Sequence, residues 1–183
     1  DLRTAYLDEW LYLNSHYNAI DANRPFAKND SLATIANKMA SLDQNTIQDT
    51  LSLLDYQEIQ KAQDILLKAK NIKIFGSHTN AMISQEFVTK MRRINRNVTI
   101  ASTFHYVDYE AYHSDQDTCA IIISYSGENA GLIKCMEILK HKEVPIISLT
   151  SIGDNTISQM SNCRLNITTR EKLYSKIGNF TSN

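Results

Sequence analysis

The first third of the chain is patterned as helices. Over residues 1–20, apolar side chains recur every three or four positions, and this spacing predicts an amphipathic helix. The helix is expected to end before Pro25, because the residue preceding a proline avoids the helical conformation. Asn29-Asp30-Ser31 supplies a cap for a second helix, since short polar side chains accept hydrogen bonds from its first N–H groups. The aromatic-rich stripe of residues 1–20 is expected to pack on a second copy or a preceding domain, rather than only on its own domain.

Two more helices are predicted before the pattern changes. One is expected to start after Asp43 and to turn Ile47 and Leu51 inward. The other is expected to start at Asp55, because Asp55 and Glu58 stand at the spacing of a capping box. No proline- or glycine-rich linker is present in the chain, so the boundary near residue 55 is predicted to be rigid.

From residue 71 onward, short apolar runs alternate with helical patterns, which is typical of a parallel sheet with helices on both faces. The clearest strand, Cys119–Ile123, has no polar alternation and is expected to be buried on both faces. The predicted fold is therefore α/β, a five-stranded parallel sheet flanked by helices and preceded by an all-helical N-terminal extension. We interpret residues 1–54 as a helical connector or oligomerisation extension, and residues 55–183 as the second domain. The predicted strands span residues 71–76, 98–101, 119–124, 145–149 and 164–167, and the predicted helices span residues 80–94, 128–141 and 154–160.

Two polar turns follow predicted strands, Gly76–Asn80 after the first and Ser124–Asn129 after the third. Right-handed crossovers bring the carboxyl ends of parallel strands to one edge of the sheet, where open α/β proteins bind their ligands. The second turn also leads into a helix, whose first N–H groups lack internal acceptors and whose dipole favours an anion. The two turns therefore predict a site for an anion such as phosphate. An ordinary capped turn without a ligand is the alternative interpretation.

The second turn resembles a known family signature. Ser124-Tyr125-Ser126-Gly127-Glu128-Asn129 is similar to the Ser-x-Ser-Gly-x-Thr motif of SIS (sugar isomerase) domains. Ile72–Asn80 resembles that family's first strand and loop, and Val144–Thr150 resembles one of its later strands. The resemblance covers residues 55–175. The helices before it resemble the connector of RpiR-type transcriptional regulators, which carry an N-terminal helix-turn-helix domain and a C-terminal SIS domain.

This resemblance implies a three-layer, flavodoxin-like fold for residues 55–183. It also implies an effector-sensing domain of a DNA-binding transcriptional regulator, one that binds a phosphorylated sugar or carbohydrate derivative and assembles as a homodimer or higher oligomer. The chain starts at Asp1 within a helical pattern, so we expect DNA to be bound by an absent N-terminal domain and not by this chain. It stops at Asn183 soon after the fifth predicted strand, so the C-terminal end of the SIS domain is expected to be truncated.

The site predicted from the two turns uses neutral donors, because neither turn contains lysine or arginine. Hydroxyl and amide side chains suit phosphate oxygens and sugar hydroxyls, and Gly127 lets the backbone approach a ligand closely. Three positions depart from the family pattern: His78 replaces a glycine, Asn80 a serine and Asn129 a threonine. These departures indicate a different ligand or a weakened site. The predicted ligand-binding residues are Ser77, Thr79, Asn80, Ser124, Ser126, Gly127 and Asn129, with His78 and Glu128 as further candidates.

Catalysis would need a general base within reach of a bound sugar. Glu128 and His78 are the only ionisable side chains in the two turns. Glu128 is more simply a first-turn acid that complements the helix dipole, and His78 is more simply a hydrogen-bonded loop residue. We therefore predict no catalytic residue and no enzymatic activity. An aldose–ketose sugar phosphate isomerase is the alternative function, and a dimerisation domain with a decayed pocket is a third interpretation.

The composition narrows the choice of partners. Hydrophobic residues make up 43% of the 183 residues, and the net charge of −1 gives no basic surface for nucleic acid. No apolar run is long enough to span a membrane, and we expect a cytoplasmic protein. The three cysteines are widely spaced and fit reduced core thiols. No metal site and no cofactor are predicted, because His105, Asp108 and His113 match no common ligand spacing.

Overall fold

The computed structural model describes residues 20–76, 79–102 and 107–168. The helix predicted over residues 1–20 therefore lies almost wholly outside the described residues, as do Ser77 and His78. The described chain forms two compact units, which are treated separately below. One contains the described residues up to Leu54, Ser151–Gly153 and residues 166–168, and the other spans Asp55–Thr150 and Asp154–Leu165.

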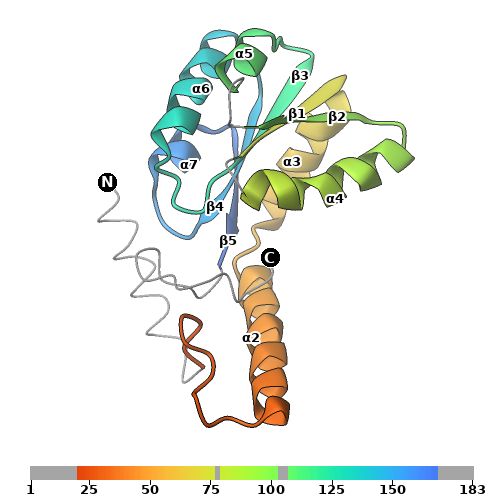
Figure 1. Cartoon of the computed structure of the whole chain (residues 1–183). Coiled ribbons are helices and arrows are strands. Elements are labelled where there is room, and N and C mark those ends of the chain that lie inside the picture. The colour runs from red at the N-terminus through yellow and green to blue at the C-terminus, as the bar shows by residue number, and fades with distance from the viewer. Residues whose placement is uncertain (1–19, 77–78, 103–106, 169–183) are drawn as a thin grey trace. The chain divides into compact units, whose positions relative to one another are not determined.

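The described part of the helical unit contains one long helix, α2 (Leu32–Ser52) (Figure 1). Ser31 caps it by accepting a hydrogen bond from the N–H of Thr34 at 3.1 Å, which confirms the predicted cap. The predicted break after Asp43 is wrong. The sequence around Asp43 contains neither proline nor glycine, so nothing interrupts the series of backbone hydrogen bonds.

The predicted inward face of this helix is also wrong. Ile47 and Leu51 are 57% and 51% exposed, whereas Leu42 and Thr46 are buried. A buried threonine is tolerated here because its hydroxyl donates to the carbonyl of Leu42 at 2.9 Å. The exposed apolar side chains remain a face that this unit does not cover by itself.

Helix α3 (Tyr56–Lys68) begins the sheet-bearing unit. The carboxylate of Asp55 accepts hydrogen bonds from the N–H groups of Gln57 (2.8 Å) and Glu58 (3.4 Å), so the predicted cap is confirmed. The reciprocal half of the predicted capping box is replaced by a longer-range bond. The carboxylate of Glu58 accepts from the N–H of Arg164 at 2.6 Å, which ties the start of α3 to the last strand.

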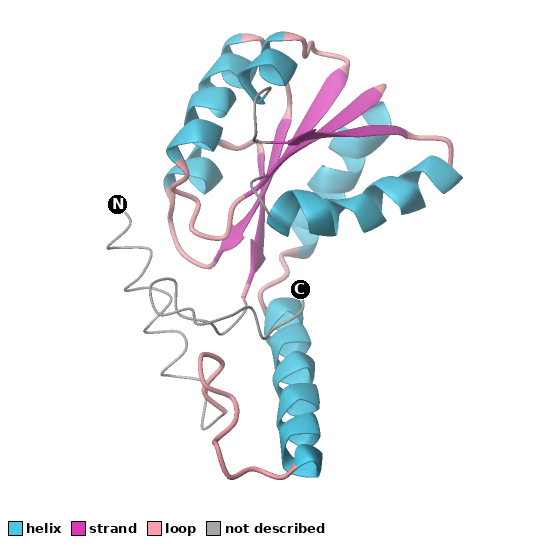
Figure 2. Cartoon of the chain, in the orientation of Figure 1, coloured by secondary structure: helices cyan, strands magenta, loops and turns pink. Residues whose placement is uncertain are grey.

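Five strands form one parallel sheet in the order β2-β1-β3-β4-β5, which confirms the predicted fold (Figure 2). Helices cover both faces: α3 and α4 lie on one side, and α5, α6 and α7 lie on the other (Figures 1 and 2). The strands are β1 (Asn71–Gly76), β2 (Asn97–Ser102), β3 (Thr118–Ile123), β4 (Ile146–Ser151) and β5 (Cys163–Ile167). The helices between them are α4 (Thr79–Arg93), α5 (Val107–Tyr112), α6 (Ala130–His141) and α7 (Thr156–Met160).

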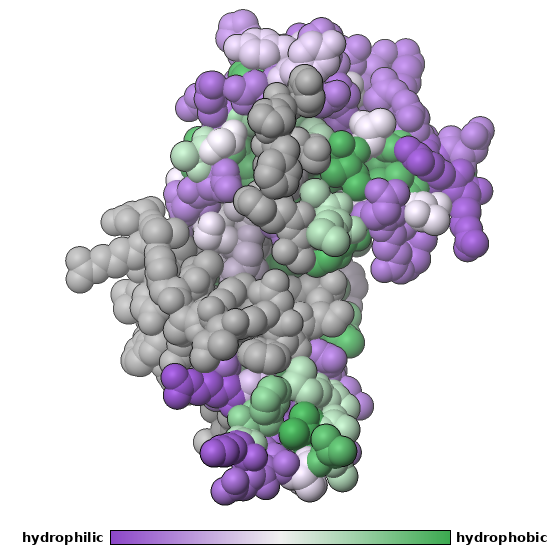
Figure 3. Space-filling model, in the orientation of Figure 1, coloured by the Kyte–Doolittle hydropathy of each residue, from purple (hydrophilic) through white to green (hydrophobic). Residues whose placement is uncertain are grey.

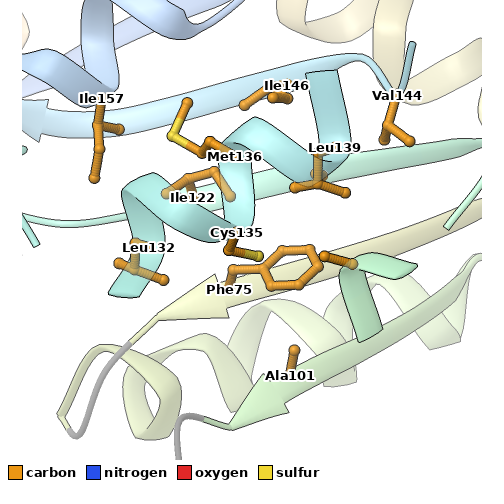
Figure 4. Packing of buried hydrophobic residues seen from close by; sticks show 12 residues of the cluster. Phe75, Ala101, Ile122, Leu132, Cys135, Met136, Leu139, Val144, Ile146 and Ile157 are labelled. Carbon is orange, nitrogen blue, oxygen red and sulfur yellow. The ribbon is translucent and has the colours of Figure 1, made fainter. Parts of the chain in front are cut away.

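Burial on both faces explains the uninterrupted apolar run of β3. Cys119 and Ile121 pack in the core on the α3 and α4 side, and Ala120 and Ile122 pack in the core on the α6 side. Figure 4 shows the second cluster, in which Ile122 lies among side chains of β1, β4 and α6. A strand that feeds two cores has no polar face to alternate with.

Lys73 is a charged residue in the middle of β1. Its ammonium lies 2.9 Å from a carboxylate oxygen of Glu110 and donates at 3.0 Å to the carbonyls of Glu110 and His113. Lysine favours the carboxyl end of a helix, where the last carbonyls lack donors. Lys73 thereby fixes the end of α5 to the sheet.

Candidate ligand site

Gly76 and Asn80, the two ends of the first turn, lie next to Ile123, which precedes the second turn, at the point where the strand order reverses. From β1 the chain moves to one neighbour, β2, and then crosses to the other side of β1 to form β3. Gly76, the last residue of β1, is in register with Ile123, the last residue of β3. A crevice outside the carboxyl ends of two such strands is the usual ligand site of open α/β sheets.

Asn80 joins the first turn to the second strand of this pair. Its side-chain amide donates to the carbonyl of Ile123 at 3.3 Å. Gly76 permits the approach, since a Cβ on Gly76 would lie 3.2 Å from the Cβ of Asn80. No described residue donates to the amide oxygen of Asn80, which can therefore accept from a ligand. The other predicted residues of this turn, Ser77, His78 and the side chain of Thr79, lie outside the described residues.

Ser124 begins the second turn, which we call the serine turn (residues 124–129). Its N–H donates to the carbonyl of Leu149 at 3.0 Å, so the backbone continues the sheet pairing by one residue. The side chain is only 5% exposed, and its hydroxyl makes no hydrogen bond to another described residue. No described residue accepts its proton, so this hydroxyl can donate to a ligand.

Ser126 and Gly127 shape the middle of the turn. Gly127 has a φ of 66°, and its N–H donates to the carbonyl of Ser124 at 3.0 Å, so the chain reverses tightly. The hydroxyl oxygen of Ser126 accepts from the N–H of Glu128 at 3.3 Å. Its proton therefore points away from that N–H and can be donated elsewhere.

Asn129 is the N-cap of α6. Its side-chain oxygen accepts from the N–H of Leu132 at 3.1 Å, so the helix starts at Ala130 and not at the predicted residue 128. The cap satisfies one of the first N–H groups, and those of Ala130 and Gly131 have no acceptor inside the helix. These groups and the dipole of the 12-residue helix favour an anion at the serine turn.

Glu128 does not lie where the sequence predicts it. It precedes the N-cap of α6 and therefore is not a first-turn acid of that helix. Its two carboxylate oxygens accept from the N–H (2.8 Å) and the hydroxyl (2.9 Å) of Thr156, the first residue of α7. Thr156 therefore engages both oxygens of this carboxylate. Sequence reasoning missed Thr156, although an asparagine before it, Asn155, is a typical helix cap.

The remaining candidates for reactive or metal-binding groups are engaged or buried. Burial raises the pKa of the Cys119, Cys135 and Cys163 thiols to about 12. Asp108 pairs with Lys134 at 2.8 Å, and His113 bonds the carbonyl of Tyr109 through Nδ1 at 2.8 Å. Within the described ranges, no three His, Cys, Asp or Glu side chains form a group suited to a metal ion.

A pocket of about 440 Å³ lies at the opposite edge of the sheet, beside α3 and the starts of β3, β4 and β5. Its polar side chains are largely committed to neighbours: Lys61 pairs with Glu58, and Gln116 bonds Glu143. No set of free donors converges on it, so its chemistry does not select a ligand. It is lined by Lys61, Asp64, Ile65, Lys68, Ala69, Gln116, Thr118, Pro145 and Asn162.

Comparison with known proteins places the sequence in context. The family model described as SIS domain matches residues 65–183. The Bacillus subtilis protein YbbH, described as an uncharacterised HTH-type transcriptional regulator, is 28% identical over 142 residues, which cover 78% of this chain and 50% of YbbH. The chain thus spans about half the length of this relative. Helices α2 to α7 include no segment both long and apolar enough to cross a bilayer.

Solved structures share the fold at low sequence identity. Vibrio vulnificus NanR complexed with ManNAc-6P superposes with a TM-score of 0.73 at 21% identity, over 80% of this chain and 56% of NanR. The sugar isomerase domain of an RpiR transcription factor from Sphaerobacter thermophilus gives 0.67 at 12% identity, over 73% of this chain and 75% of that one. Escherichia coli CFT073 c3406 in complex with A5P gives 0.66 at 14% identity and 81% coverage of both chains.

Proposed function

Because the chain belongs to the SIS domain family, we propose that it is the effector-sensing part of a DNA-binding transcriptional regulator. Its effector is a phosphorylated sugar or carbohydrate derivative, bound at the edge where β1 and β3 end. The phosphate lies against the serine turn and the start of α6, and the sugar faces the turn after β1. The complex of NanR with ManNAc-6P supports this choice of ligand class, since the two proteins share a fold.

The observation that carries the proposal is the hydroxyl of Ser124. The Ser124 side chain is 5% exposed just after β3, and its hydroxyl makes no hydrogen bond within the described part of the chain. A phosphate oxygen would be a suitable acceptor for its proton. The hydroxyl of Ser126 and the N–H groups of Ala130 and Gly131 add neutral donors to the same side of the turn, and helix α6 adds its dipole.

We propose binding without catalysis. The hydrogen bonds that Thr156 donates to Glu128 support this view, because they occupy the carboxylate that would otherwise be the base in the serine turn. A ligand that is only bound acts through its different affinity for two arrangements of the protein.

DNA binding is proposed for a helix-turn-helix part outside these 183 residues, in keeping with the description of YbbH. The regulator acts in the cytoplasm, as a homodimer or a larger symmetric assembly. Large apolar side chains exposed on the helices of the sheet-bearing unit support an assembly, and Figure 3 shows such green side chains among the purple ones. Examples are Tyr56 and Leu67 on α3 and Met82 and Ile83 on α4, and Ile94 is exposed just after α4.

Calorimetric titration with sugar phosphates, ManNAc-6P among them, and with the matching unphosphorylated sugars tests the proposal. Ligand at about 100 times its dissociation constant adds about 2.7 kcal/mol of stability, so melting curves give a second readout. Ser124→Ala removes the proposed donor. Ser114→Ala is the matched control. Ser114, between α5 and β3, is also buried, but its hydroxyl already donates to the carbonyl of Glu110 at 2.7 Å.

Binding of the phosphorylated form alone, lost in Ser124→Ala and kept in Ser114→Ala, is the expected result. Binding that survives Ser124→Ala would place the ligand elsewhere. Each sugar phosphate that binds is also incubated with the protein and examined by NMR. Conversion of an aldose to a ketose would show that the protein is an isomerase, and absence of binding to the whole panel would leave a dimerisation domain.

A further inference from the structure

The serine turn is fastened to the start of α7. The carbonyl of Gly127 accepts from the N–H of Ile157 at 3.0 Å. The carboxylate of Glu128 accepts twice from Thr156, through the N–H at 2.8 Å and the hydroxyl at 2.9 Å. Two consecutive residues of the turn are therefore held by two consecutive residues of one short helix.

The start of α7 is itself well fixed. Asn155 is buried and caps the helix in a reciprocal arrangement with Ser158, with bonds of 2.8 and 3.2 Å. Its amide also donates to the hydroxyl of Thr150 at 3.1 Å. Thr156 therefore offers Glu128 two donors in set positions, and the carboxylate is not free to swing towards a ligand.

A second bond carries this restraint from Glu128 to a predicted ligand contact. The N–H of Glu128 donates to the hydroxyl oxygen of Ser126 at 3.3 Å. That bond uses a lone pair of Ser126 and leaves its proton to be donated to an acceptor. Hydrogen bonds therefore connect Thr156 to Glu128 and Glu128 to Ser126.

We propose that Glu128 is a positioning residue of the ligand site. It does not touch the ligand; by binding Thr156 it holds its own N–H against Ser126 and so fixes the direction in which the Ser126 hydroxyl donates. This inference rests on the proposed function, since it names a role within that site. Donors held in place before binding give affinity that mobile donors do not.

The test compares Glu128→Ala, Glu128→Gln and Thr156→Val in the full chain, with ManNAc-6P and inorganic phosphate as probes. Glu128→Ala removes both bonds and is expected to weaken binding about tenfold, the effect of one hydrogen bond to a charged group. Glu128→Gln keeps an oxygen for the N–H of Thr156, so its dissociation constant should stay within about threefold of the original. Thr156→Val keeps the N–H and the side-chain volume, and should give an intermediate loss. In the double variant of Glu128→Ala and Thr156→Val, the two effects should not add.

Amide hydrogen exchange of residues 126–129 without ligand gives a readout independent of binding. Exchange in the turn should accelerate in Glu128→Ala and not in Glu128→Gln, while the sheet stays protected. Unchanged exchange in Glu128→Ala, or unchanged affinity in a protein that binds a probe, overturns the inference. If the unaltered chain binds no probe, the proposed function fails and the exchange result alone decides whether Glu128 orders the turn. Thr156→Val keeps the test decisive should Glu128→Ala not fold.

Discussion

Gly127 and Asn155 pack so closely that no side chain fits between them. A Cβ on Gly127 would lie 1.9 Å from the side-chain oxygen of Asn155 and 2.1 Å from its Cγ. Gly127 also has a φ of 66°, which other residues adopt at a cost. Glycine in this turn is therefore required by the protein itself, whatever ligand it binds.

The first prediction follows from that contact. Gly127→Ala should lower the free energy of unfolding by about 3 kcal/mol, because it combines backbone strain with a clash against the buried, hydrogen-bonded side chain of Asn155. Gly131→Ala is the matched control, since its Cβ would meet only the side-chain oxygen of Asn129, at 3.3 Å. Alanine in helix α6 should be neutral or stabilising by up to about 1 kcal/mol. Urea denaturation measures both variants, and equal stabilities would contradict the packing described here.

Substitutions of Asn129 can distinguish its role as a helix cap from its proposed role in ligand binding. Asn129→Ala should lose about 1 kcal/mol of stability, because the N–H of Leu132 loses its acceptor. Asn129→Asp keeps the cap and adds a charge that the helix dipole favours, so its stability should match or exceed that of the original. The same charge repels an anion, and binding of ManNAc-6P should weaken about tenfold. Tighter binding by Asn129→Asp would rule out a phosphate at the start of α6.

Stability in acid should depend on Glu58. Burial alone would raise the pKa of its carboxyl, but the N–H of Arg164, with Lys61 nearby, lowers it below the ordinary value. The folded state therefore binds this proton less tightly than the unfolded state. The stabilisation is present above the unfolded pKa of about 4.3 and is lost as the pH falls through the folded value.

Glu58→Gln should accordingly be less stable at pH 7 and lose less stability between about pH 5 and pH 3. Glu137→Gln is the control, because Glu137 is exposed on α6 and its carboxylate makes no hydrogen bond to another described residue. Denaturant midpoints at several pH values give the comparison. Parallel pH profiles for Glu58→Gln and the unaltered chain would show that Glu58 does not contribute to the loss of stability in acid.

The three thiols should be inert in the folded protein. The pKa of each is raised to about 12 by burial, so the thiolate is scarce at pH 8 and a reagent cannot reach it. Ellman's reagent should detect no thiol in native protein and three in denaturant. Rapid reaction of one thiol in native protein would mean that its part of the core opens readily.

The strands were predictable because the hydrophobic pattern of each one is visible in its own residues. Cys119–Ile123 is apolar throughout since it packs on two cores, and such a run is visible without any knowledge of its neighbours. The predicted strand starts differ from the observed ones by one residue or less. The caps at Ser31 and Asp55 were equally local, because a cap bonds to N–H groups two or three residues away.

The bond between Glu128 and Thr156 was not predictable in the same way. The two residues are 28 positions apart, and their contact exists only because β4 lies next to β3. From the sequence alone, an acidic residue near the start of a helix is expected to complement the helix dipole. The exposed face of α2 was missed for a related reason: hydrophobic spacing locates an apolar stripe but does not show what covers it.

The hydrogen bonds between the serine turn and α7 affect the order in which parts of the protein fold during synthesis. Domains form while the chain emerges from its N-terminus, and strands β1 and β3 can pair once Ile123 is available. The turn after β3, however, receives its last hydrogen bonds from Thr156 and Ile157. A nascent chain that ends before these residues contains every serine of the turn but lacks the groups that hold it. Pairing of β1 with β3 can therefore precede completion of the serine turn during synthesis.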